Sequence, residues 1–286
     1  MEYTNPDALA ETEWLAQNLE ASGVKVLDCT YAMPGITINP IDEFNKKHIP
    51  GAVWFDINDI SDNPGGKNHM LPSADAFAEK VGALGISAED HVITYDHIGG
   101  MSAAARVWWM FRCFGHDKVS WLNGSLPKWE AENRPVTGDA PPITATSYAG
   151  KPLNKDLVRS IQQMKDNVSS HSEQVIDARA NPRFTGEDPG PNPNIKAGHI
   201  PGSVNVPYKV LLDPSDGTML PANSLTDIFS DQGVNLGLPI ANSCGSGVTA
   251  NIPLLALYLL GNTNAAVYDG SWNEWGADAD TPVETG

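Results

Sequence analysis

The chain of 286 residues contains its own sequence twice, and this duplication constrains the fold more than any other feature. Four short segments of the first half return in the same order in the second half, at separations of 149, 151, 149 and 146 residues. A repeat of this length is the size of a whole domain. We therefore predict two homologous domains in tandem. The paired segments are Val26–Asp28 with Val175–Asp177, His48–Val53 with His199–Val204, Met70–Pro72 with Met219–Pro221, and Asn123–Ser125 with Asp269–Ser271.

Both halves alternate strand-like and helix-like segments. This alternation predicts an α/β fold in which each domain has a mainly parallel sheet flanked by helices. The predicted strands are 24–28, 52–55, 91–95, 175–177, 203–205 and 239–243, and the predicted helices are 73–84, 102–114 and 248–260. Residues 133–142 are rich in proline and lack periodicity, as linkers do. We predict a first domain at 1–132, a linker at 133–148 and a second domain at 149–286.

The composition limits the classes of partner. Lys and Arg number 18 against 35 Asp and Glu, which gives a net charge of −17 and argues against nucleic acid or an anionic membrane as partner. The apolar run 252–260 is too short to span a bilayer. Three cysteines without a Cys-x-x-Cys motif suit a reducing compartment and predict neither disulfides nor a metal site. The first lysine is Lys25, so the N-terminus lacks the basic region of a targeting peptide. We expect a cytoplasmic location, and a cleaved targeting segment absent from this chain stays an alternative.

The segment Cys244–Ala250 carries the clearest chemical signal. A strand-like run leads into Cys244, Gly245 and Gly247 follow, and a helix-like stretch begins at Val248. Glycines permit a turn in which successive backbone N–H groups point inward, and a helix N-terminus favours an anion. A thiolate is therefore stabilised here, and Cys244 is the predicted nucleophile. In an open parallel sheet such a loop lies beyond the carboxyl ends of the strands, so we expect the active site to face the interdomain cleft.

The other two cysteines fit a different role. Cys29 follows a strand-like run and Cys113 lies in a helix-like run, so both are predicted to be buried small hydrophobic residues. In the first half, the position that corresponds to Cys244 in the repeat, 148 residues earlier, is Asp96. We infer that the first domain keeps the architecture and has lost the nucleophile.

The sequence of the same loop argues against two other reactions. A cysteine phosphatase needs an arginine six residues after the nucleophile, and this chain has Ala250 there. A serine hydrolase acting through Ser246 lacks the spacing of a nucleophile elbow. Pro253 adds a detail, because a proline fits only the first turn of a helix. It predicts a helix that begins near Thr249 or Ala250 and leaves the preceding N–H groups free.

These residues together resemble the tandem-domain rhodanese family, and within it the 3-mercaptopyruvate sulfurtransferases. The resemblance runs from about Trp14 to Trp275. It implies that Cys244 attacks the sulfur of a donor and forms a persulfide, which an acceptor thiol or cyanide then takes. The acceptor would be a thioredoxin-like protein or a small thiol, and no cofactor or metal is implied. The segments that carry the resemblance are Cys244–Thr249, the two His-Ile-Pro-Gly motifs, Asn68–Pro72, Arg106–Trp109 and Tyr268–Trp272.

The resemblance also suggests which donor is used. Relatives that prefer thiosulfate place basic residues just after the cysteine, where this loop has the neutral Gly245 and Ser246. Arg183 matches an arginine of the family that binds the carboxylate of mercaptopyruvate. The second such arginine aligns with Asn192, which offers no bidentate fork. Lys196 is near Asn192 in sequence and is either a partial substitute for the missing arginine or a solvated lysine.

The proton relay proposed for the family maps onto Ser246, His69 and Asn58, where Asn58 replaces an aspartate. Asp59 or Asp62 is a candidate substitute for that carboxylate. His69 is predicted to protonate the departing enolate, because an ordinary histidine titrates near neutral pH. A plain interface residue is the competing role for His69. His48 and His199 recur in both halves, whereas the cysteine does not, so both are predicted to be structural.

The sequence thus predicts a sulfurtransferase that uses 3-mercaptopyruvate, with a catalytically silent first domain. Two alternatives stay open. One is a thiosulfate:cyanide sulfurtransferase, which Asn192 in place of arginine favours. The other is a persulfide carrier or scaffold that delivers sulfur to a partner protein without turning over small acceptors.

Overall fold

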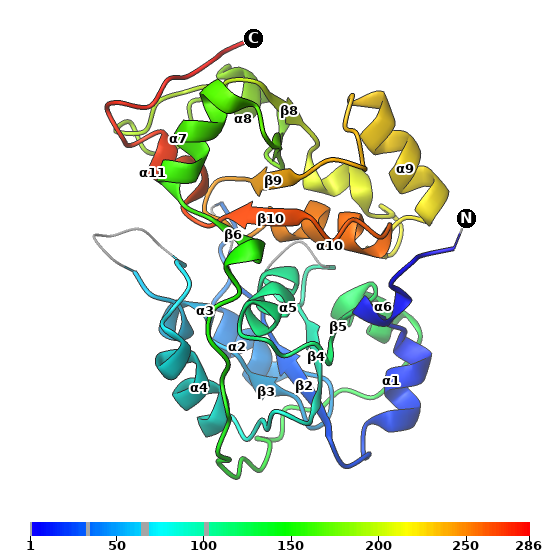
Figure 1. The fold of residues 1–286 in the computed structure, drawn as a ribbon. Coiled ribbons are helices and arrows are strands. Elements are labelled where there is room, and N and C mark those ends of the chain that lie inside the picture. Colours follow the sequence, from blue (N-terminus) through cyan, green and yellow to red (C-terminus); the bar gives the residue numbers. More distant parts are fainter. Residues whose placement is uncertain (1, 33–34, 64–68, 100–102) are drawn as a thin grey trace.

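Two parallel sheets of five strands each, one in each half of the chain, organise this computed structural model, which describes residues 2–32, 35–63, 69–99 and 103–286. The strand orders are β1-β5-β4-β2-β3 and β6-β10-β9-β7-β8, so each half repeats the same topology. This confirms the predicted α/β class and the tandem repeat (Figure 1). The strands are β1 (Leu9–Ala10), β2 (Val24–Asp28), β3 (Val53–Trp54), β4 (His91–Tyr95), β5 (Val119–Leu122), β6 (Val158–Arg159), β7 (Gln174–Asp177), β8 (Ser203–Asn205), β9 (Ile240–Ser243) and β10 (Ala265–Tyr268).

The predicted strands are all present. β2, β4 and β8 have the predicted bounds, and β3, β7 and β9 differ by one residue at one or both ends. The prediction missed β1, β5, β6 and β10. β1 and β6 have two residues each, and β5 and β10 are four-residue buried runs. Runs this short have no periodicity that separates a buried strand from a piece of helix.

The helices cover the faces of the sheets. α4 begins directly after Ser73, whose hydroxyl accepts a hydrogen bond from the N–H of Ala76 at 3.2 Å. α5 ends as predicted before Gly115, which has a φ of 71°, whereas residue 102 of the predicted helix lies outside the described residues. In the described part of the chain, no helix is both long and apolar enough to cross a membrane. The helices are α1 (Thr12–Asn18), α2 (Pro40–Lys46), α3 (Ile57–Ile60), α4 (Ala74–Ala83), α5 (Ala104–Cys113), α6 (Ser125–Ala131), α7 (Ile161–Ser170), α8 (Asn181–Thr185), α9 (Ala222–Asp231), α10 (Asn251–Leu259) and α11 (Ser271–Trp275), with single 3-10 turns η1 (Pro6–Ala8), η3 (Lys155–Leu157) and η4 (Tyr208–Leu211).

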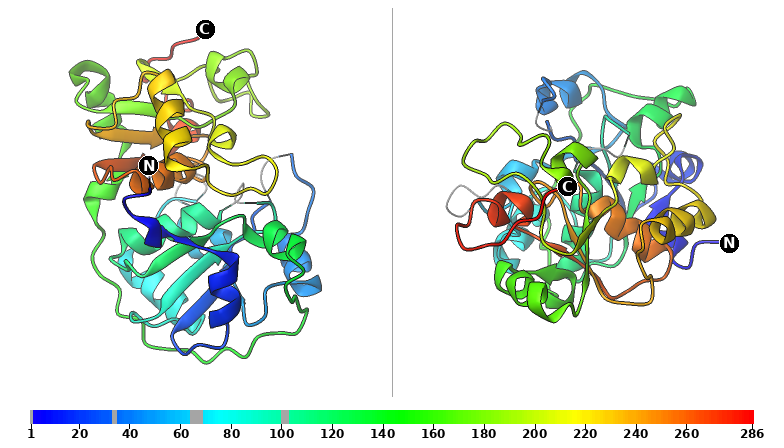
Figure 2. Two further views of the ribbon diagram at one scale, coloured as in Figure 1. Left: turned by 90° about the vertical axis from the view of Figure 1, so that its right-hand side faces the viewer. Right: turned by 90° about the horizontal axis from the view of Figure 1, so that it is seen from above.

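The two halves meet through α5 and α10, which lie between the sheets (Figures 1 and 2). One cluster of buried apolar side chains extends through both halves and includes Trp108 of α5 and Leu254 of α10. Arg112 of α5 lies over the ring of Tyr258 of α10, with its guanidinium carbon 3.7 Å from the ring centre. A shared core makes the interface rigid enough to hold a site built from both halves.

The connection between the halves lies along the first half. Thr137 exchanges two backbone hydrogen bonds with His48, of 2.8 and 2.9 Å, and the N–H of Thr146 donates to the carbonyl of Gly82. At the other end of the chain, the N–H of Thr4 donates to the carbonyl of Leu259 in the second half. The domain bounds of 1–132 and 149–286 with a linker at 133–148 stay a prediction.

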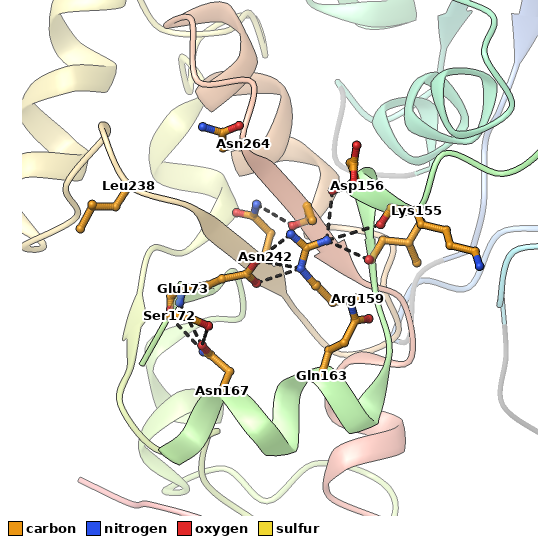
Figure 3. Close-up of polar contacts among 12 residues, drawn as sticks. Lys155, Asp156, Arg159, Gln163, Asn167, Ser172, Glu173, Leu238, Asn242 and Asn264 are labelled. Carbon is orange, nitrogen blue, oxygen red and sulfur yellow. Dashed lines mark hydrogen bonds and ion pairs between the residues drawn. The ribbon is translucent and has the colours of Figure 1, made fainter. Parts of the chain in front are cut away.

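A polar cluster fixes the start of the second sheet (Figure 3). Arg159 at the end of β6 binds Glu173 with Nη2 at 2.6 Å from Oε1, and its Nη1 donates to the carbonyl of Asp156 at 3.1 Å. The Asn167 side chain on α7 accepts from the N–H of Glu173 and donates to its carbonyl, each at 2.9 Å. These bonds hold β6, α7 and the residues before β7 together.

Candidate active site

Cys244 lies directly after β9, at the carboxyl edge of the second sheet, and is 1% exposed. Its backbone is fixed on both sides. The N–H of Cys244 donates to Oγ of Ser271 at 3.1 Å, and its carbonyl accepts from the N–H of Trp272 at 3.0 Å. The first two residues of α11 therefore set the direction in which the cysteine leaves the strand.

The loop after the cysteine has free hydrogen-bond donors. None of the backbone N–H groups of residues 245–249 donates to another group among the described residues. Gly247 has a φ of 73°, a conformation that L side chains rarely adopt. The side-chain amide of Asn251 donates to the carbonyls of Gly247 and Val248 in this loop, at 2.8 and 2.9 Å. The carbonyls are thus bound by the protein, while the N–H groups are left for an anionic ligand.

The helix that follows the loop begins at Asn251, with Ala250 as its N-cap. This is within one or two residues of the predicted start, and Pro253 lies in the first turn as predicted. The N–H groups of 245–249 precede the helix, so its positive end adds to their attraction for an anion.

Asp96 occupies the same place in the first half, directly after β4. It is fully buried, and its Oδ1 accepts from the N–H of Ile98 at 2.9 Å. The N–H of Asp96 donates to Oγ of Ser125 at 3.3 Å, as the N–H of Cys244 donates to Ser271. The two halves therefore match at this position, where the first has a carboxylate and the second has the thiol.

His69 lies in the first half and is 1% exposed. Its Nε2 is 3.0 Å from Oδ1 of Asn58, and its ring meets the ring of Tyr31 edge-on at 4.7 Å. With a carbonyl oxygen as partner, Nε2 carries the proton and Nδ1 is the unprotonated nitrogen. Nδ1 is buried and has no hydrogen-bond partner among the described residues.

The predicted neutral titration of His69 is wrong. Burial and, as the smaller cause, the positive charge of Arg106 together lower the pKa of His69 from 6.5 to about 4. Desolvation disfavours the charged imidazolium, and a nearby cation acts in the same direction. At neutral pH His69 is therefore an uncharged imidazole and a poor source of a proton.

This pKa has a measurable effect on stability. Between pH 6.5 and about 4 the unfolded state binds a proton at His69 and the folded state does not, so stability falls as the pH falls. The full effect is about 3 kcal/mol, at about 1.4 kcal/mol per pKa unit. We expect His69→Gln to lose less stability than the wild type when unfolding by urea is compared at pH 7 and 4.5. His171→Asn, at an exposed histidine, is the control and should lose as much stability as the wild type. An equal loss of stability in the wild type and in His69→Gln would contradict the prediction.

The predicted relay is only partly assembled. Asn58 contacts His69 as expected, but no hydrogen bond joins Ser246 to His69 within the described ranges. Neither candidate aspartate replaces Asn58. Asp59 pairs with Lys80 at 2.8 Å, and Oδ1 of Asp62 accepts from the N–H of its neighbour at 2.9 Å.

Arg183 lies on α8, in the connection that follows β7. β7 is parallel to β9 and adjacent to it, so this connection leaves the same edge of the sheet as Cys244. Arg183 has one loose ion pair, 3.7 Å from the exposed Asp188, and its side chain is 25% exposed. The guanidinium lies against Gly190, where a Cβ would be 1.5 Å from Nη1. Because no other polar group of the described residues binds the guanidinium, most of its donors are available for a ligand.

The other two predicted substrate contacts differ from Arg183. Asn192 is exposed, and its Oδ1 accepts from the N–H of Asn194 at 3.0 Å within its own turn. Lys196 is neither a solvated lysine nor a substitute cation, because its ammonium donates to the carbonyls of Asp278 and Thr281, each at 2.7 Å. It holds the C-terminal segment in place.

The remaining predicted residues lie in the core. His48 and His199 each hydrogen-bond a carbonyl through Nδ1 at 2.8 Å, stack on a phenylalanine and are buried, as expected of structural residues. Cys29 and Cys113 are fully buried, as predicted, and burial raises the pKa of both thiols well above the usual range. In the part of the chain that the structure describes, no cluster of three or more His, Cys, Asp or Glu could hold a metal ion.

Sequence reasoning gave no role to Arg106, Asp269 or Ser271. Arg106 of the first half forms a buried ion pair with Asp269 of the second, 2.6 Å from Nη1 to Oδ1. Ser271 is the cap of the Cys244 N–H described above. The sequence does contain a signal for Ser271, because its Asp-Gly-Ser segment repeats the Asn-Gly-Ser segment of the first half. In the structure both serines have a positive φ, 49° at Ser271 and 54° at Ser125.

Comparison with known proteins agrees with this architecture. The model of the rhodanese-like domain matches residues 11–132 and again residues 160–278. The thiosulfate/3-mercaptopyruvate sulfurtransferase 2 of Arabidopsis thaliana is 43% identical over 97% of this chain and 86% of its own length. The thiosulfate sulfurtransferase of Rattus norvegicus is 41% identical over 94% of this chain and 91% of its own. The structure of SseA from Escherichia coli, described as a 3-mercaptopyruvate sulfotransferase, has a TM-score of 0.83 and 34% identity, covering 93% of this chain and 98% of that one. This chain belongs to the rhodanese family, with two rhodanese-like domains in tandem.

Proposed function

We propose that this protein is a sulfurtransferase that moves the sulfur of 3-mercaptopyruvate to a thiol or cyanide through a persulfide on Cys244 and releases pyruvate. The loop after Cys244 supports this most strongly, because its N–H groups at 245–249 have no acceptor among the described residues. Such a ring of donors stabilises the negative charge of a persulfide. Relatives of this chain carry the names of sulfurtransferases for both 3-mercaptopyruvate and thiosulfate.

In the proposed cycle the Cys244 thiolate attacks the sulfur of the donor. A sulfur–sulfur bond forms as the carbon–sulfur bond breaks, and the electron pair leaves with carbon as the enolate of pyruvate, which takes a proton from water. An acceptor thiolate or cyanide then attacks the outer sulfur and regenerates the Cys244 thiolate. Two separate half-reactions of this kind give ping-pong kinetics.

The charges around the loop favour the carboxylate donor. Thiosulfate is a dianion that releases charged sulfite, so it needs a cation beside its sulfur, worth about 4 kcal/mol at 4 Å in a dielectric of about 20. Gly245 and Ser246 are neutral, and Arg106 is already bound to Asp269. Among the described residues, Arg183 has only a loose ion pair with Asp188. We propose that Arg183 binds the mercaptopyruvate carboxylate, and that the pocket lacks a second arginine because Asn192 stands in its place.

The deciding measurement compares initial rates with 3-mercaptopyruvate and thiosulfate, each with a dithiol and with cyanide as acceptor. We expect a clear preference for 3-mercaptopyruvate. A preference for thiosulfate would overturn the donor assignment. Stoichiometric persulfide on Cys244 without turnover would instead make the protein a sulfur carrier. We propose a thioredoxin-like protein or a small thiol as the physiological acceptor and the cytoplasm as the location.

We expect Arg183→Met to lower kcat/KM for 3-mercaptopyruvate about 10- to 100-fold, mainly through KM, because one charged hydrogen-bonding partner of the carboxylate is lost. Arg183→Lys should restore part of the loss. Arg134→Met removes a cation that pairs with Glu13 and Glu132 in the first half and should leave kcat/KM unchanged. An unchanged KM in Arg183→Met would exclude Arg183 as the carboxylate site.

A further inference from the structure

Arg106 lies on α5, in the half that has no nucleophile, and its side chain is fully buried. The guanidinium reaches into the other half. Nη1 donates to the carbonyl of Gly247 at 3.0 Å and to Oδ1 of Asp269 at 2.6 Å, and Nη2 donates to the carbonyl of His69. The ring of Trp109 lies 4.4 Å from its guanidinium carbon. The Arg106 side chain thus connects the loop at residues 245–249, which is proposed to bind the persulfide, with His69.

Asp269 extends this connection. Its second oxygen, Oδ2, accepts from the N–H of Leu71 at 2.8 Å, two residues after His69. Asp269 also begins the turn whose Ser271 hydroxyl accepts from the N–H of Cys244 at 3.1 Å. The ion pair of Arg106 with Asp269 therefore ties together the loop, the segment 69–71 and the turn that caps the nucleophile.

The bond to Gly247 sets the direction of a donor in the loop. In a trans peptide the carbonyl and the following N–H point in opposite directions. When Arg106 and Asn251 hold the carbonyl of Gly247, the N–H of Val248 is therefore held on the opposite side of the same peptide. This N–H is one of the donors proposed to bind the persulfide.

Stability alone does not account for a buried arginine here. Burying a guanidinium carries a large desolvation penalty, and well-packed apolar side chains serve an interface equally well. Nε of Arg106 has no partner among the described residues, so the burial is not even fully compensated. The matching position in the other half is apolar: Leu254 on α10 stands 148 residues after Arg106, the separation of Cys244 from Asp96. The arginine serves only the half that has the nucleophile.

We infer that Arg106 is a positioning residue for sulfur transfer, supplied by the silent half, which with Asp269 holds the Cys244 loop in the shape that binds the persulfide. This inference rests on the proposed function. It explains why the first domain persists without a nucleophile, because the second domain has no arginine of its own at this place.

The test compares Arg106→Met, Arg106→Lys and Asp269→Asn with the control Arg112→Met. Arg112 is a second arginine of α5 at the same interface, where it lies over Tyr258 and away from the loop. We expect kcat to fall at least 100-fold in Arg106→Met and about 10-fold in Asp269→Asn, with KM for the donor changed less than threefold. Arg106→Lys should recover part of kcat, and Arg112→Met should stay within twofold of the wild type. The double variant that combines Arg106→Met with Asp269→Asn should lose no more kcat than Arg106→Met alone, because both residues act in one network.

A second readout does not need turnover. The rate at which iodoacetamide alkylates Cys244 reports the environment of the thiol, and we expect it to change at least tenfold in Arg106→Met and Asp269→Asn but not in Arg112→Met. If the wild type shows no turnover, the proposed function fails and this readout still tests the role of Arg106. If Arg106→Met does not fold, the kcat and alkylation rates of Asp269→Asn and Arg106→Lys test the inference instead. A folded Arg106 or Asp269 variant with wild-type kcat and alkylation would overturn the inference.

Discussion

Replacing Cys244 by serine is expected to abolish sulfur transfer, with a fall in rate of at least about 10⁴-fold for every donor and acceptor. A hydroxyl at this place cannot form a persulfide, and its conjugate base is not populated at neutral pH. The substitution removes one buried sulfur atom and leaves the backbone bonds of residue 244 to Ser271 and Trp272 in place. The fold should therefore be intact while the reaction is lost.

Mass spectrometry of the protein after incubation with 3-mercaptopyruvate checks the same point directly. The wild type should gain the mass of one sulfur atom, and Cys244→Ser should gain none. Cys29→Ala and Cys113→Ala are matched controls, because both thiols are buried and have raised pKa values. Both should still gain the sulfur atom. A persulfide on Cys244→Ser would place the reaction at another cysteine.

Gly247→Ala should also have a large effect, a loss of more than about 100-fold in kcat. A Cβ at Gly247 would lie 2.4 Å from the backbone carbonyl oxygen of Asp269 and 3.1 Å from Nη1 of Arg106. The φ of 73° adds strain for any L side chain. The loop and the turn beginning at Asp269 cannot both keep their positions, and that turn holds the N–H of Cys244 through Ser271.

Gly245→Ala is the matched comparison in the same loop. A Cβ at Gly245 meets nothing within 4 Å, and its φ is not in the left-handed region, so the loop should keep its shape and lose far less activity. Initial rates and the melting temperature of both variants distinguish a misshaped loop from an unfolded domain. Equal losses in the two variants would show that any added methyl blocks the donor, and that the contact with Asp269 is not what matters.

Local patterns explain which parts of the site could be predicted. The strand, Cys244, the glycine turn and the start of α10 are contiguous in sequence, so each follows from rules that act over a few residues. Pro253 placed the helix start within two residues for the same reason. The strands β1, β5, β6 and β10 were missed because four or fewer residues carry no period and because, unlike the equally short β3, β7 and β8, they overlap none of the repeated segments.

The roles of His69 and Lys196 were mistaken for a common reason. The sequence predicts an ordinary pKa for His69, but burial and Arg106 together lower this pKa to about 4. The sequence also predicts a solvated or substrate-facing Lys196, but the ammonium of Lys196 donates to the carbonyls of Asp278 and Thr281. In both cases the partners come from elements distant in the chain, and sequence spacing does not reveal them.

Repeats, glycine turns and strand–helix alternation are properties of consecutive residues, so they are sufficient to predict a duplicated α/β protein with one nucleophile. How the two halves cooperate becomes visible only in the folded structure. Arg106 and Asp269 are 163 positions apart and form one buried ion pair. Packing of the two halves removes both charges from water, and a buried charge needs a partner within hydrogen-bond reach. Such pairing depends on how two domains dock, which no local pattern in the chain encodes.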